Sequence, residues 1–299
     1  MPLQYERGAF MIRENSKFNA GMLMALLAAL LIFVILISPL FYTLYLSVHN
    51  ADYLNITSFV GLKNYIKVLN NPQIIKSIGT TFIISFAGLA ISMTLGTFLA
   101  LWVDKKSGGF AYAIQIIGLV PWVTSMVVGG LLWKWILDPD LGLLNYALRS
   151  LGFPTLNIYQ TSTTAIWAVI IVMAWRTIGY AMVMILAGLK GISHELIEAG
   201  NVDGANKFQI FWKIKFPIIK TPIMISSIVL FMSNFNNVTI PMVLTGGGPG
   251  NATSVTSLEL YRMAFSFYKF GDASALSFII FAINAILTII YIKAVKYDV

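Results

Sequence analysis

The chain has 299 residues, of which 58% are hydrophobic and 11% are charged, and its formal net charge is +8. Soluble domains carry about 25% charged residues, so this composition, with its apolar residues in long blocks, predicts an integral membrane protein and excludes a large soluble module. The absence of cysteine excludes disulfides and thiolate metal sites, and two distant histidines, His49 and His194, give almost no support to a zinc site. The basic residues lie in short loops beside the apolar segments, so they predict membrane topology and no nucleic-acid partner.

Six segments are long and apolar enough to cross a hydrocarbon core, which takes about 20 helical residues. They are Gly21–Val48, Ser77–Val103, Phe110–Leu132, Thr163–Leu189, Thr221–Leu244 and Ala273–Val295. The first follows Arg13 and Lys17, as a signal peptide would, but it is too long for a cleavable apolar core. We therefore expect a retained span and an all-α membrane protein with six transmembrane helices.

Lysine and arginine counts predict the orientation of these spans. With both termini in the cytoplasm, twelve basic residues lie inside, namely Arg7, Arg13, Lys17, Lys105, Lys106, Lys190, Lys207, Lys213, Lys215, Lys220, Lys293 and Lys296. Seven then lie outside, namely Lys63, Lys67, Lys76, Lys134, Arg149, Arg262 and Lys269. The excess favours cytoplasmic termini, because cytoplasmic loops are enriched in Lys and Arg. The polar loop between the fourth and fifth spans then faces the cytoplasm, where ATP is.

That loop, residues 192–216, is predicted to form two short helices around a turn. Ser193 is a good N-cap, and Glu195 suits the positive end of the first helix. Asp203-Gly204 predicts the turn, because glycine can take a positive φ. A second amphipathic stretch then carries apolar side chains among lysines, and we expect Pro217 to end it and open the next span. The alternative is a loop whose aromatic and lysine side chains rest on lipid headgroups.

The spacing within this loop carries a more specific resemblance. Glu198-Ala199-Gly200 is followed by Gly204, Ile214 and Pro217. This pattern resembles the EAA loop of ATP-binding-cassette importer permeases, with Gly200 in place of the third alanine and Phe216 in place of a leucine. The resemblance implies that the loop docks onto a separate ATPase, with a charged contact from Glu198 and close approach at Gly204. The residues that it assigns to coupling are Glu198, Ala199, Gly200, Asp203, Gly204, Ala205, Ile214 and Pro217.

Further motifs are similar to those of the sugar-type branch, the relatives of the larger maltose permease subunit. They are Phe59-Val60-Gly61-Leu62-Lys63-Asn64-Tyr65, Pro121-Trp122, Trp133-Lys134-Trp135, Gly142-Leu143-Leu144-Asn145 and Leu244-Thr245-Gly246-Gly247-Gly248-Pro249. The chain lacks that subunit's large external domain and its two added N-terminal spans. The resemblance implies the type I importer permease fold in the inner membrane of a prokaryotic cell. It also implies a second homologous permease subunit, an ATPase dimer, an extracytoplasmic solute-binding protein and a carbohydrate substrate.

The chain itself is not expected to be an enzyme. No G-x-x-x-x-G-K-[ST] sequence occurs, so no phosphate-binding loop is present, and ATP and Mg would be bound by the partner ATPase. We expect no cofactor in this chain. Its predicted organisation is a cytoplasmic segment (1–20), a first span with an external loop (21–75) and a core permease domain (76–299), whose EAA loop lies at about 190–220.

Two polar clusters within spans are candidates for the substrate path, because polar groups in hydrocarbon are costly. The fourth span carries Trp175, Arg176, Thr177 and Tyr180, and the fifth carries Asn234 and Asn237, which are three residues apart and are therefore expected to share a helix face. Amides and aromatic rings suit a sugar, and the residues at matching positions line the sugar site in the resembling maltose subunit. The alternative is that these residues form hydrogen bonds between helices.

Arg176 leaves two interpretations open. It lies near the middle of a span, at a position that is apolar in the maltose subunit, so it could pair with an anionic substrate such as a uronate or a phosphorylated polyol. Alternatively, and in our view preferably, it satisfies carbonyls at a helix end or faces the partner permease.

Three other functions are weighed against a sugar importer. An ion-coupled secondary transporter predicts carboxylates within the spans, and none occurs there; Asp272 lies only at an edge. A membrane scaffold needs neither the Glu198 loop nor the two asparagines. A permease for another solute class, such as glycerol phosphate or amino acids, is the nearest alternative, disfavoured by the external and Gly-Gly-Pro motifs.

Overall fold

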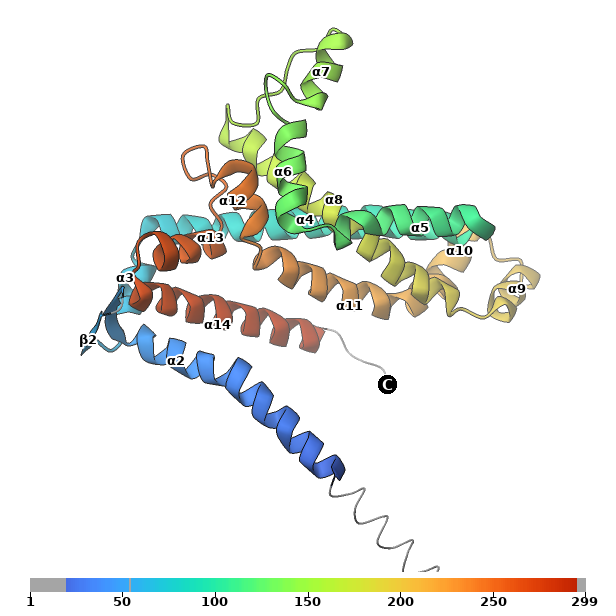
Figure 1. The fold of residues 1–299 in the computed structure, drawn as a ribbon. Helices are drawn as coiled ribbons and strands as arrows, with labels where there is room; N and C mark the ends of the chain where they lie inside the picture. The colour runs from blue at the N-terminus through green and yellow to red at the C-terminus, as the bar shows by residue number, and fades with distance from the viewer. Residues whose placement is uncertain (1–19, 54, 295–299) are drawn as a thin grey trace, which may run out of the picture. The chain divides into compact units, whose positions relative to one another are not determined.

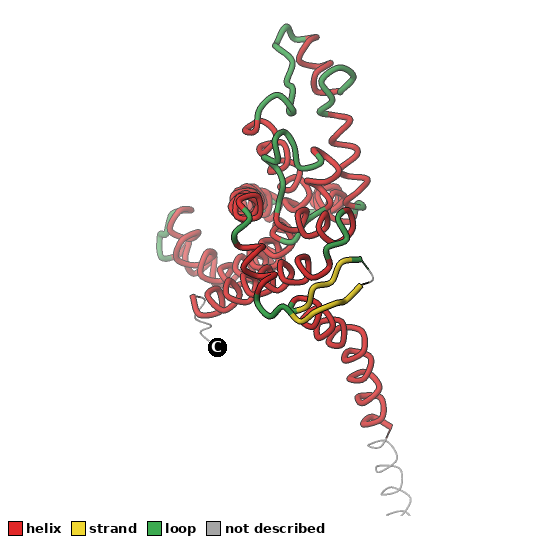
Figure 2. The backbone as a smooth tube through the Cα atoms, turned by 90° about the vertical axis from the view of Figure 1, so that its left-hand side faces the viewer, coloured by secondary structure: helices red, strands yellow, loops and turns green. Residues whose placement is uncertain are grey.

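The computed structural model describes residues 20–53 and 55–294 and is almost entirely helical (Figures 1 and 2). Two compact units divide the chain. One comprises Met1–Val68 with Tyr268–Phe278, and the other comprises Leu69–Phe267 with Ile279–Val299.

The first unit begins with an apolar helix, Ala20–Ser47, of 28 residues. It includes the wide turn η1 (Phe33–Ile37) and α2 (Ser38–Ser47), and it leads into a hairpin of β1 (His49–Asp52) and β2 (Asn55–Phe59) and then into α3 (Lys63–Leu69). The strands are antiparallel, with His49 opposite Phe59 and Asp52 opposite Asn55. The Asn64 amide donates to the carbonyls of Ser47 and His49, at 2.9 Å each, which fixes the hairpin against the helices.

The second unit contains the remaining helices and is centred on α8. Its elements are α4 (Pro72–Asp104), α5 (Gly108–Val123), α6 (Met126–Ile136), α7 (Leu143–Ser150), α8 (Ser162–Lys190), α9 (His194–Val202), α10 (Lys207–Ile210), η2 (Phe211–Lys215), α11 (Phe216–Phe235), α12 (Thr239–Thr245), α13 (Thr256–Tyr261), η3 (Arg262–Ser266) and most of α14 (Phe270–Ala294). Helices α4, α5 and α11 all pack on α8 (Figure 1).

Small residues let these helices approach closely. A Cβ placed on Gly96 of α4 would lie 2.6 Å from the Ala181 Cβ of α8, and one on Gly179 of α8 would lie 1.7 Å from the Gly118 carbonyl oxygen of α5. Close approach at small residues is how helices associate in lipid, where no hydrophobic driving force brings them together.

Five described helices are long and apolar enough to cross a membrane, and a bent pair supplies a sixth span. Four of the six predicted spans, the first, second, fourth and sixth, match single helices within a few residues at each described end. The six-span prediction is confirmed on this count. The predicted 1–20 segment lies outside the described residues except for Ala20, and the orientation of the termini stays a prediction.

The third span was wrong as a continuous helix. It consists of α5 and α6, which bend by 98° at Thr124 and Ser125, two residues with extended backbone angles. Pro121 lacks the N–H that would bond the carbonyl four residues earlier, which weakens the last turn of α5. The Ser125 carbonyl then accepts from the N–H of Gly129 at 2.8 Å and starts α6.

The fifth span was also wrong as a continuous helix. α11 ends at Phe235, and α12 begins at Thr239, so Asn234 and Asn237 do not share a helix face. Pro241 cannot donate to the Asn237 carbonyl, which accepts from the Ser257 hydroxyl instead. The Asn237 side chain in turn accepts from the N–H of Ile240, in the first turn of α12, at 3.0 Å.

Candidate functional site

The break between α5 and α6 gathers most of the predicted substrate residues. We call the group of Trp122, Met126, Trp175, Arg176, Tyr180 and Asn237 the break site. Trp122 lies in the last turn of α5, Met126 begins α6, and residues of the fourth span, α8, contact both helices. The predicted clusters from the fourth and fifth spans therefore meet at a helix break that the sequence analysis did not anticipate.

Arg176 contacts the C-terminal end of α5. One guanidinium nitrogen, Nη2, donates to the Trp122 carbonyl at 3.2 Å, and the guanidinium lies 5.1 Å from the centre of the Trp122 ring. The Trp122 ring also contacts Tyr180, whose ring stacks on it with centroids 4.4 Å apart. A cation is favoured at a helix C-terminus and over an aromatic ring, so the charge has two compensating contacts within the span. Its Nε is buried and has no hydrogen-bond partner.

Trp175 and Asn237 contact α6 on the other side of the break. A Cβ on Gly129 would lie 3.5 Å from the Trp175 ring, which meets Trp133 edge-on at 5.6 Å. The Asn237 amide nitrogen lies 3.6 Å from the Met126 sulfur. One amide and one indole ring thus lie against the first turns of α6, and these are group types that can contact a sugar.

Thr177 and Asn234 lie away from these contacts, in the packing between helices. Thr177 is 1% exposed, and its hydroxyl lies 2.6 Å from that of Ser92 on α4, which is the interhelical bond that the alternative interpretation predicts. Asn234 is 4% exposed, and its amide nitrogen has no partner. Gly88 of α4 makes room for that amide, because a Cβ there would lie 3.3 Å from the nitrogen.

The EAA-like loop, residues 192–216, has the predicted helix-turn-helix form. Ser193 is the N-cap of α9, Glu195 lies in its first turn, and Gly204 has a φ of +77° in the turn that follows. The N–H of Ala205 donates to the Gly200 carbonyl at 3.0 Å, and a Cβ on Gly200 would lie 2.8 Å from Ile214 Cδ1. The two helices of the loop are therefore folded against each other.

Contrary to the prediction, Pro217 does not end the second helix. α10, η2 and α11 continue as one helix from Lys207 to Phe235, of 29 residues. The wide turn η2 precedes the proline, and within it the Phe216 N–H reaches back to the Phe211 carbonyl. A residue without an N–H is tolerated there because it falls in the first turn of α11, where the regular hydrogen-bond pattern is already interrupted.

The loop presents a mixed outer surface. Glu198, Ala199, Asp203 and Gly204 are exposed, beside large exposed apolar side chains that include Leu196, Val202, Phe208 and Trp212. Its inner side, with Ile197, Phe211 and Ile214, packs on a buried apolar cluster formed by α4, α8 and α11. Exposed apolar groups with a carboxylate among them suit the surface of another protein.

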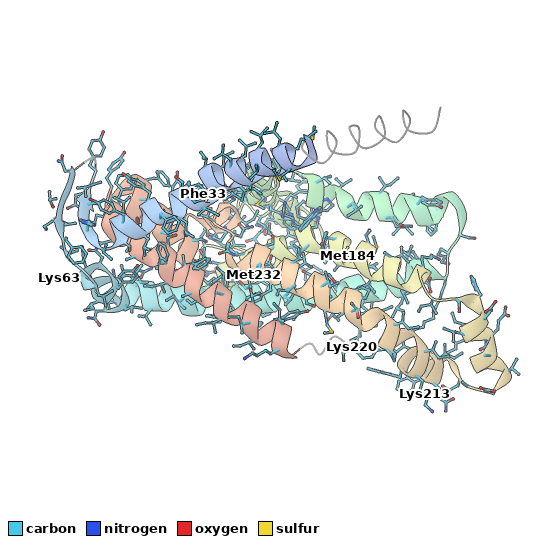
Figure 3. The ribbon with its side chains drawn as sticks, turned by 90° about the horizontal axis from the view of Figure 1, so that it is seen from below. Phe33, Lys63, Met184, Lys213, Lys220 and Met232 are labelled. Carbon is cyan, nitrogen blue, oxygen red and sulfur yellow. The ribbon has the colours of Figure 1, made fainter. Side chains whose placement is uncertain are left out.

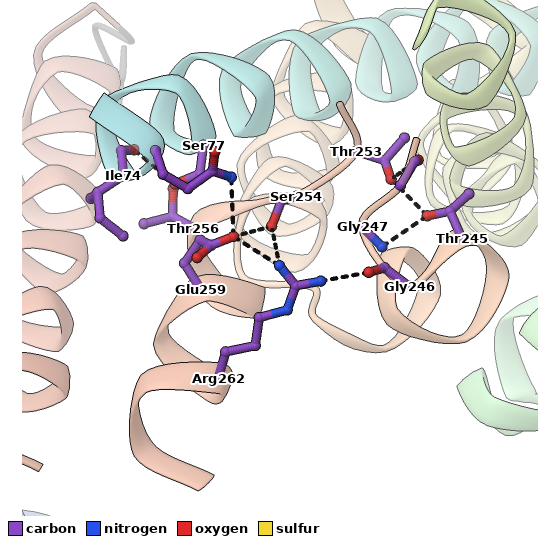
Figure 4. Close-up of polar contacts among 12 residues, drawn as sticks. Ile74, Ser77, Thr245, Gly246, Gly247, Thr253, Ser254, Thr256, Glu259 and Arg262 are labelled. Carbon is purple, nitrogen blue, oxygen red and sulfur yellow. Dashed lines mark hydrogen bonds and ion pairs between the residues drawn. The ribbon is translucent and has the colours of Figure 1, made fainter. Parts of the chain in front are cut away.

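A polar network holds the turn that contains the Gly-Gly-Pro sequence (Figure 4). Glu259 accepts from Gln73 at 3.3 Å, from Arg262 at 3.1 Å and from Ser254. Arg262 also donates to the Gly246 carbonyl, which connects this carboxylate to the turn. The Gly-Gly-Pro turn is therefore held by side-chain hydrogen bonds, which the composition did not indicate. No group of three potential metal ligands occurs among residues 20–53 and 55–294.

Sequence reasoning missed Trp122 and Met126 as members of the break site. Trp122 was noted only as part of a motif, although Pro121 beside it is a sign that could have suggested a helix break. It also missed Ser92, because a serine within an apolar span has no sign that identifies its partner on another helix.

Comparison with known proteins places the chain in a family. A family model described as the inner membrane component of binding-protein-dependent transport systems matches residues 88–293. The trehalose/maltose transport system permease protein MalF of Thermococcus litoralis is 32% identical over 288 residues, covering 95% of each chain. The sulfoquinovosyl glycerol transport system permease protein SmoG of Agrobacterium fabrum is 28% identical, covering 90% of this chain and 88% of that one. The sn-glycerol-3-phosphate transport system permease protein UgpA of Pectobacterium atrosepticum is 32% identical, covering 91% and 93%.

A solved structure has the same fold. A chain of a bacterial alginate ABC transporter, in complex with an alginate pentasaccharide-bound periplasmic protein, superposes with a TM-score of 0.80 at 20% identity, covering 93% of this chain and 94% of that one. The predicted type I importer permease fold and the multi-pass membrane location are confirmed. This chain belongs to the family of inner membrane components of binding-protein-dependent transport systems.

Proposed function

We propose that this chain is one of two permease subunits of an ATP-driven carbohydrate importer. The relatives named for trehalose and maltose and for sulfoquinovosyl glycerol support a sugar or sugar derivative as the solute. The relative named for sn-glycerol-3-phosphate keeps a phosphorylated polyol as the alternative. A second similar permease, an ATPase dimer and an external solute-binding protein complete the assembly. ATP and Mg are bound by the ATPase, and this chain carries out no hydrolysis.

Coupling to the ATPase is assigned to the EAA-like loop, and the observation that carries the proposal is its geometry. Glu198 and Gly204 are exposed on a compact helix-turn-helix, and the positive φ of Gly204 keeps the turn short. The loop packs through Ile197, Phe211 and Ile214 on the ends of the spans. Closure of the ATPase dimer would therefore move the loop and the inner ends of these spans as one body.

The substrate path is assigned to the break site together with Asn234. Trp175 and Tyr180 offer aromatic faces to the C–H surfaces of a sugar ring, and Asn237 and the unpaired Asn234 amide offer hydrogen bonds to its hydroxyls. Arg176 holds the end of α5 at the break. Thr177 contributes by joining α8 to α4 behind the path.

The test is uptake by the complete transporter in proteoliposomes that contain ATP. Glu198→Lys and Gly204→Asp should abolish uptake while the four-subunit assembly still purifies intact. Glu195→Lys is the matched control, since it reverses an exposed charge one turn earlier on α9 and should retain most of the uptake. Robust uptake by both loop variants would overturn the coupling assignment.

Uptake measurements in the same proteoliposomes also distinguish this proposal from a transporter driven by an ion gradient. Uptake should require ATP and the solute-binding protein and should survive the collapse of ion gradients. Uptake by the chain alone, without ATP, would return the secondary-transporter interpretation to first place.

A further inference from the structure

Asp104, the last residue of α4, forms two ion pairs with lysines that are distant in sequence. Its Oδ2 accepts from Lys215 Nζ at 2.9 Å, and its Oδ1 lies 3.3 Å from Lys190 Nζ. The carboxylate side chain is 15% exposed, and that of Lys215 is 19% exposed, so this pair is largely screened from solvent. The backbone carbonyl of Asp104 also accepts from Lys190 at 3.3 Å.

The two lysines occupy equivalent places at the two ends of the EAA-like loop. Lys190 is the last residue of α8, immediately before the loop. Lys215 is the last residue of η2, where the loop joins α11. One carboxylate on a third helix therefore holds the point where the chain leaves the helices and the point where it returns. Among the described residues, no other acidic side chain pairs with either lysine.

Apolar residues next to the three charged residues pack together as well. Val103 next to Asp104, Leu189 next to Lys190 and Ile214 next to Lys215 belong to one cluster at this end of the helices. Apolar contacts resist separation of the helices but allow sliding and rotation, because they are not directional. A charged, hydrogen-bonded contact adds direction and register to this packing.

We propose that Asp104 is the positioning residue that transmits movement of the EAA-like loop to α4. The inference rests on the proposed function, because it presupposes that the loop receives the movement of the ATPase. Through Lys215 and Lys190, a displacement of the loop acts on α4 as well as on α8 and α11, the two helices to which the loop is covalently joined. Without the carboxylate, the loop still folds and docks, but this end of α4 follows it only through apolar packing and the bond from Lys190 to the Asp104 backbone carbonyl.

The first experiment compares solute uptake with ATP hydrolysis in the assembled transporter. Asp104→Asn, which preserves the shape of the side chain and removes its charge, should lower the number of molecules imported per ATP by about fivefold or more. Asp104→Glu, which keeps the carboxylate, should retain most of this ratio. A purely structural role would lower uptake and hydrolysis together and leave the ratio unchanged.

A matched pair of lysines separates the proposed contact from a general effect of charge. Lys215→Gln should lower the ratio, whereas Lys220→Gln should not, since Lys220 is exposed on the following turns of α11 and forms no ion pair in the described part of the chain (Figure 3). The charge exchange Asp104→Lys with Lys215→Asp should recover part of the ratio lost in Asp104→Lys alone. Equal effects of Lys215→Gln and Lys220→Gln would overturn the proposal.

A distance measurement tests the same contact without transport. The chain contains no cysteine, so spin labels can be placed at Ser107→Cys, in the short connection between α4 and α5, and at Val202→Cys, on the exposed tip of the loop, in a transporter whose other subunits also lack cysteine. Asp104→Asn should broaden the label-to-label distance distribution, and Lys220→Gln should not. An unchanged distribution and ratio in Asp104→Asn would refute this inference, whereas full uptake by Glu198→Lys and Gly204→Asp would refute the proposed function.

Discussion

The side-chain oxygens of Thr177 and Ser92 lie 2.6 Å apart and join α8 to α4. Each hydroxyl also lies within hydrogen-bond distance of a carbonyl in its own helix, Met173 for Thr177 and Gly88 for Ser92. Because each hydroxyl has a single hydrogen, one of them donates across to the other helix while the other donates to its own carbonyl, and neither needs a ligand. Both side chains are buried. Thr177 directly follows Trp175 and Arg176 on α8, so its bond to α4 holds the segment of α8 that carries both side chains.

Thr177→Val should therefore affect stability more than substrate affinity. Interhelical hydrogen bonds of this kind contribute about 0.6 kcal/mol in membrane proteins, so the melting temperature in detergent should fall modestly. The KM for uptake should stay close to that of the parent protein. A double-mutant cycle with Ser92→Ala measures the coupling, and a large rise in KM without loss of stability would show that Thr177 contacts the solute.

Gly96→Val should destabilise the packing of α4 on α8. A Cβ on Gly96 would lie 2.6 Å from the Ala181 Cβ and 3.0 Å from the Met182 nitrogen, and neither helix can withdraw without disturbing the rest of its contacts. Overpacking of this kind costs about 1–3 kcal/mol. Gly79→Ala on the same helix is the control, since nothing lies within 4 Å of its Cβ, and it should be neutral or stabilising by about 0.5–1 kcal/mol.

Thermal unfolding of the purified protein in detergent measures both variants. Similar melting temperatures for Gly96→Val and Gly79→Ala would contradict the close approach of these two helices.

Asn234→Leu should separate function from stability. The amide nitrogen of Asn234 is buried without a partner, and an unsatisfied donor of this kind costs about 1–3 kcal/mol, so its replacement by an apolar side chain of similar size should not lower the melting temperature. If the amide forms a hydrogen bond to a sugar hydroxyl, removing that bond should cost about 1.4 kcal/mol of binding free energy and raise the KM about tenfold. Uptake kinetics and unfolding of the same preparation test the pair of outcomes. An unstable variant with normal KM would assign Asn234 to helix packing.

Arg176→Leu should loosen the break without changing the charge preference of transport. It removes the donor to the Trp122 carbonyl, a hydrogen bond of about 1 kcal/mol, and the cation over the Trp122 ring. Uptake of neutral and acidic sugars should fall in parallel. A loss confined to acidic solutes would show that the guanidinium binds an anion, and Arg176→Lys would then be expected to preserve part of that uptake.

Hydropathy predicted where the spans lie but not where two of them are interrupted. Averaging over about 20 residues cannot detect a bend at Thr124 and Ser125, because the sequences on both sides are equally apolar. Pro121 and Pro241 are the local signs of the two breaks, yet prolines also occur within continuous helices of this chain, as Pro222 does in α11. Only the partner of the orphaned carbonyl, such as Ser257 for Asn237, distinguishes the two cases, and that partner is set by tertiary structure.

Local rules worked best where the relevant contacts are local. The start of α9 after Ser193 and the positive φ of Gly204 follow from preferences within a few residues, and both positions were predicted correctly, although the Ser193 side chain makes no capping hydrogen bond. The pair of Asp104 and Lys215 spans 111 residues of sequence and could not be predicted in this way. The short hairpin after the first helix was also missed, since its strands of four and five residues are mostly exposed and lack a buried alternating pattern.

The helix from Lys207 to Phe235 connects the EAA-like loop directly to the candidate substrate path. Its 29 residues make a rod about 43 Å long at 1.5 Å per residue, with the EAA-like loop at one end and Asn234 at the other. Because Lys207 and Asn234 lie near opposite ends of one helix, a displacement along its axis at Lys207 is carried toward Asn234. A shift of a few ångströms would be comparable to the length of a hydrogen bond, and therefore sufficient to make or break contacts with a solute hydroxyl.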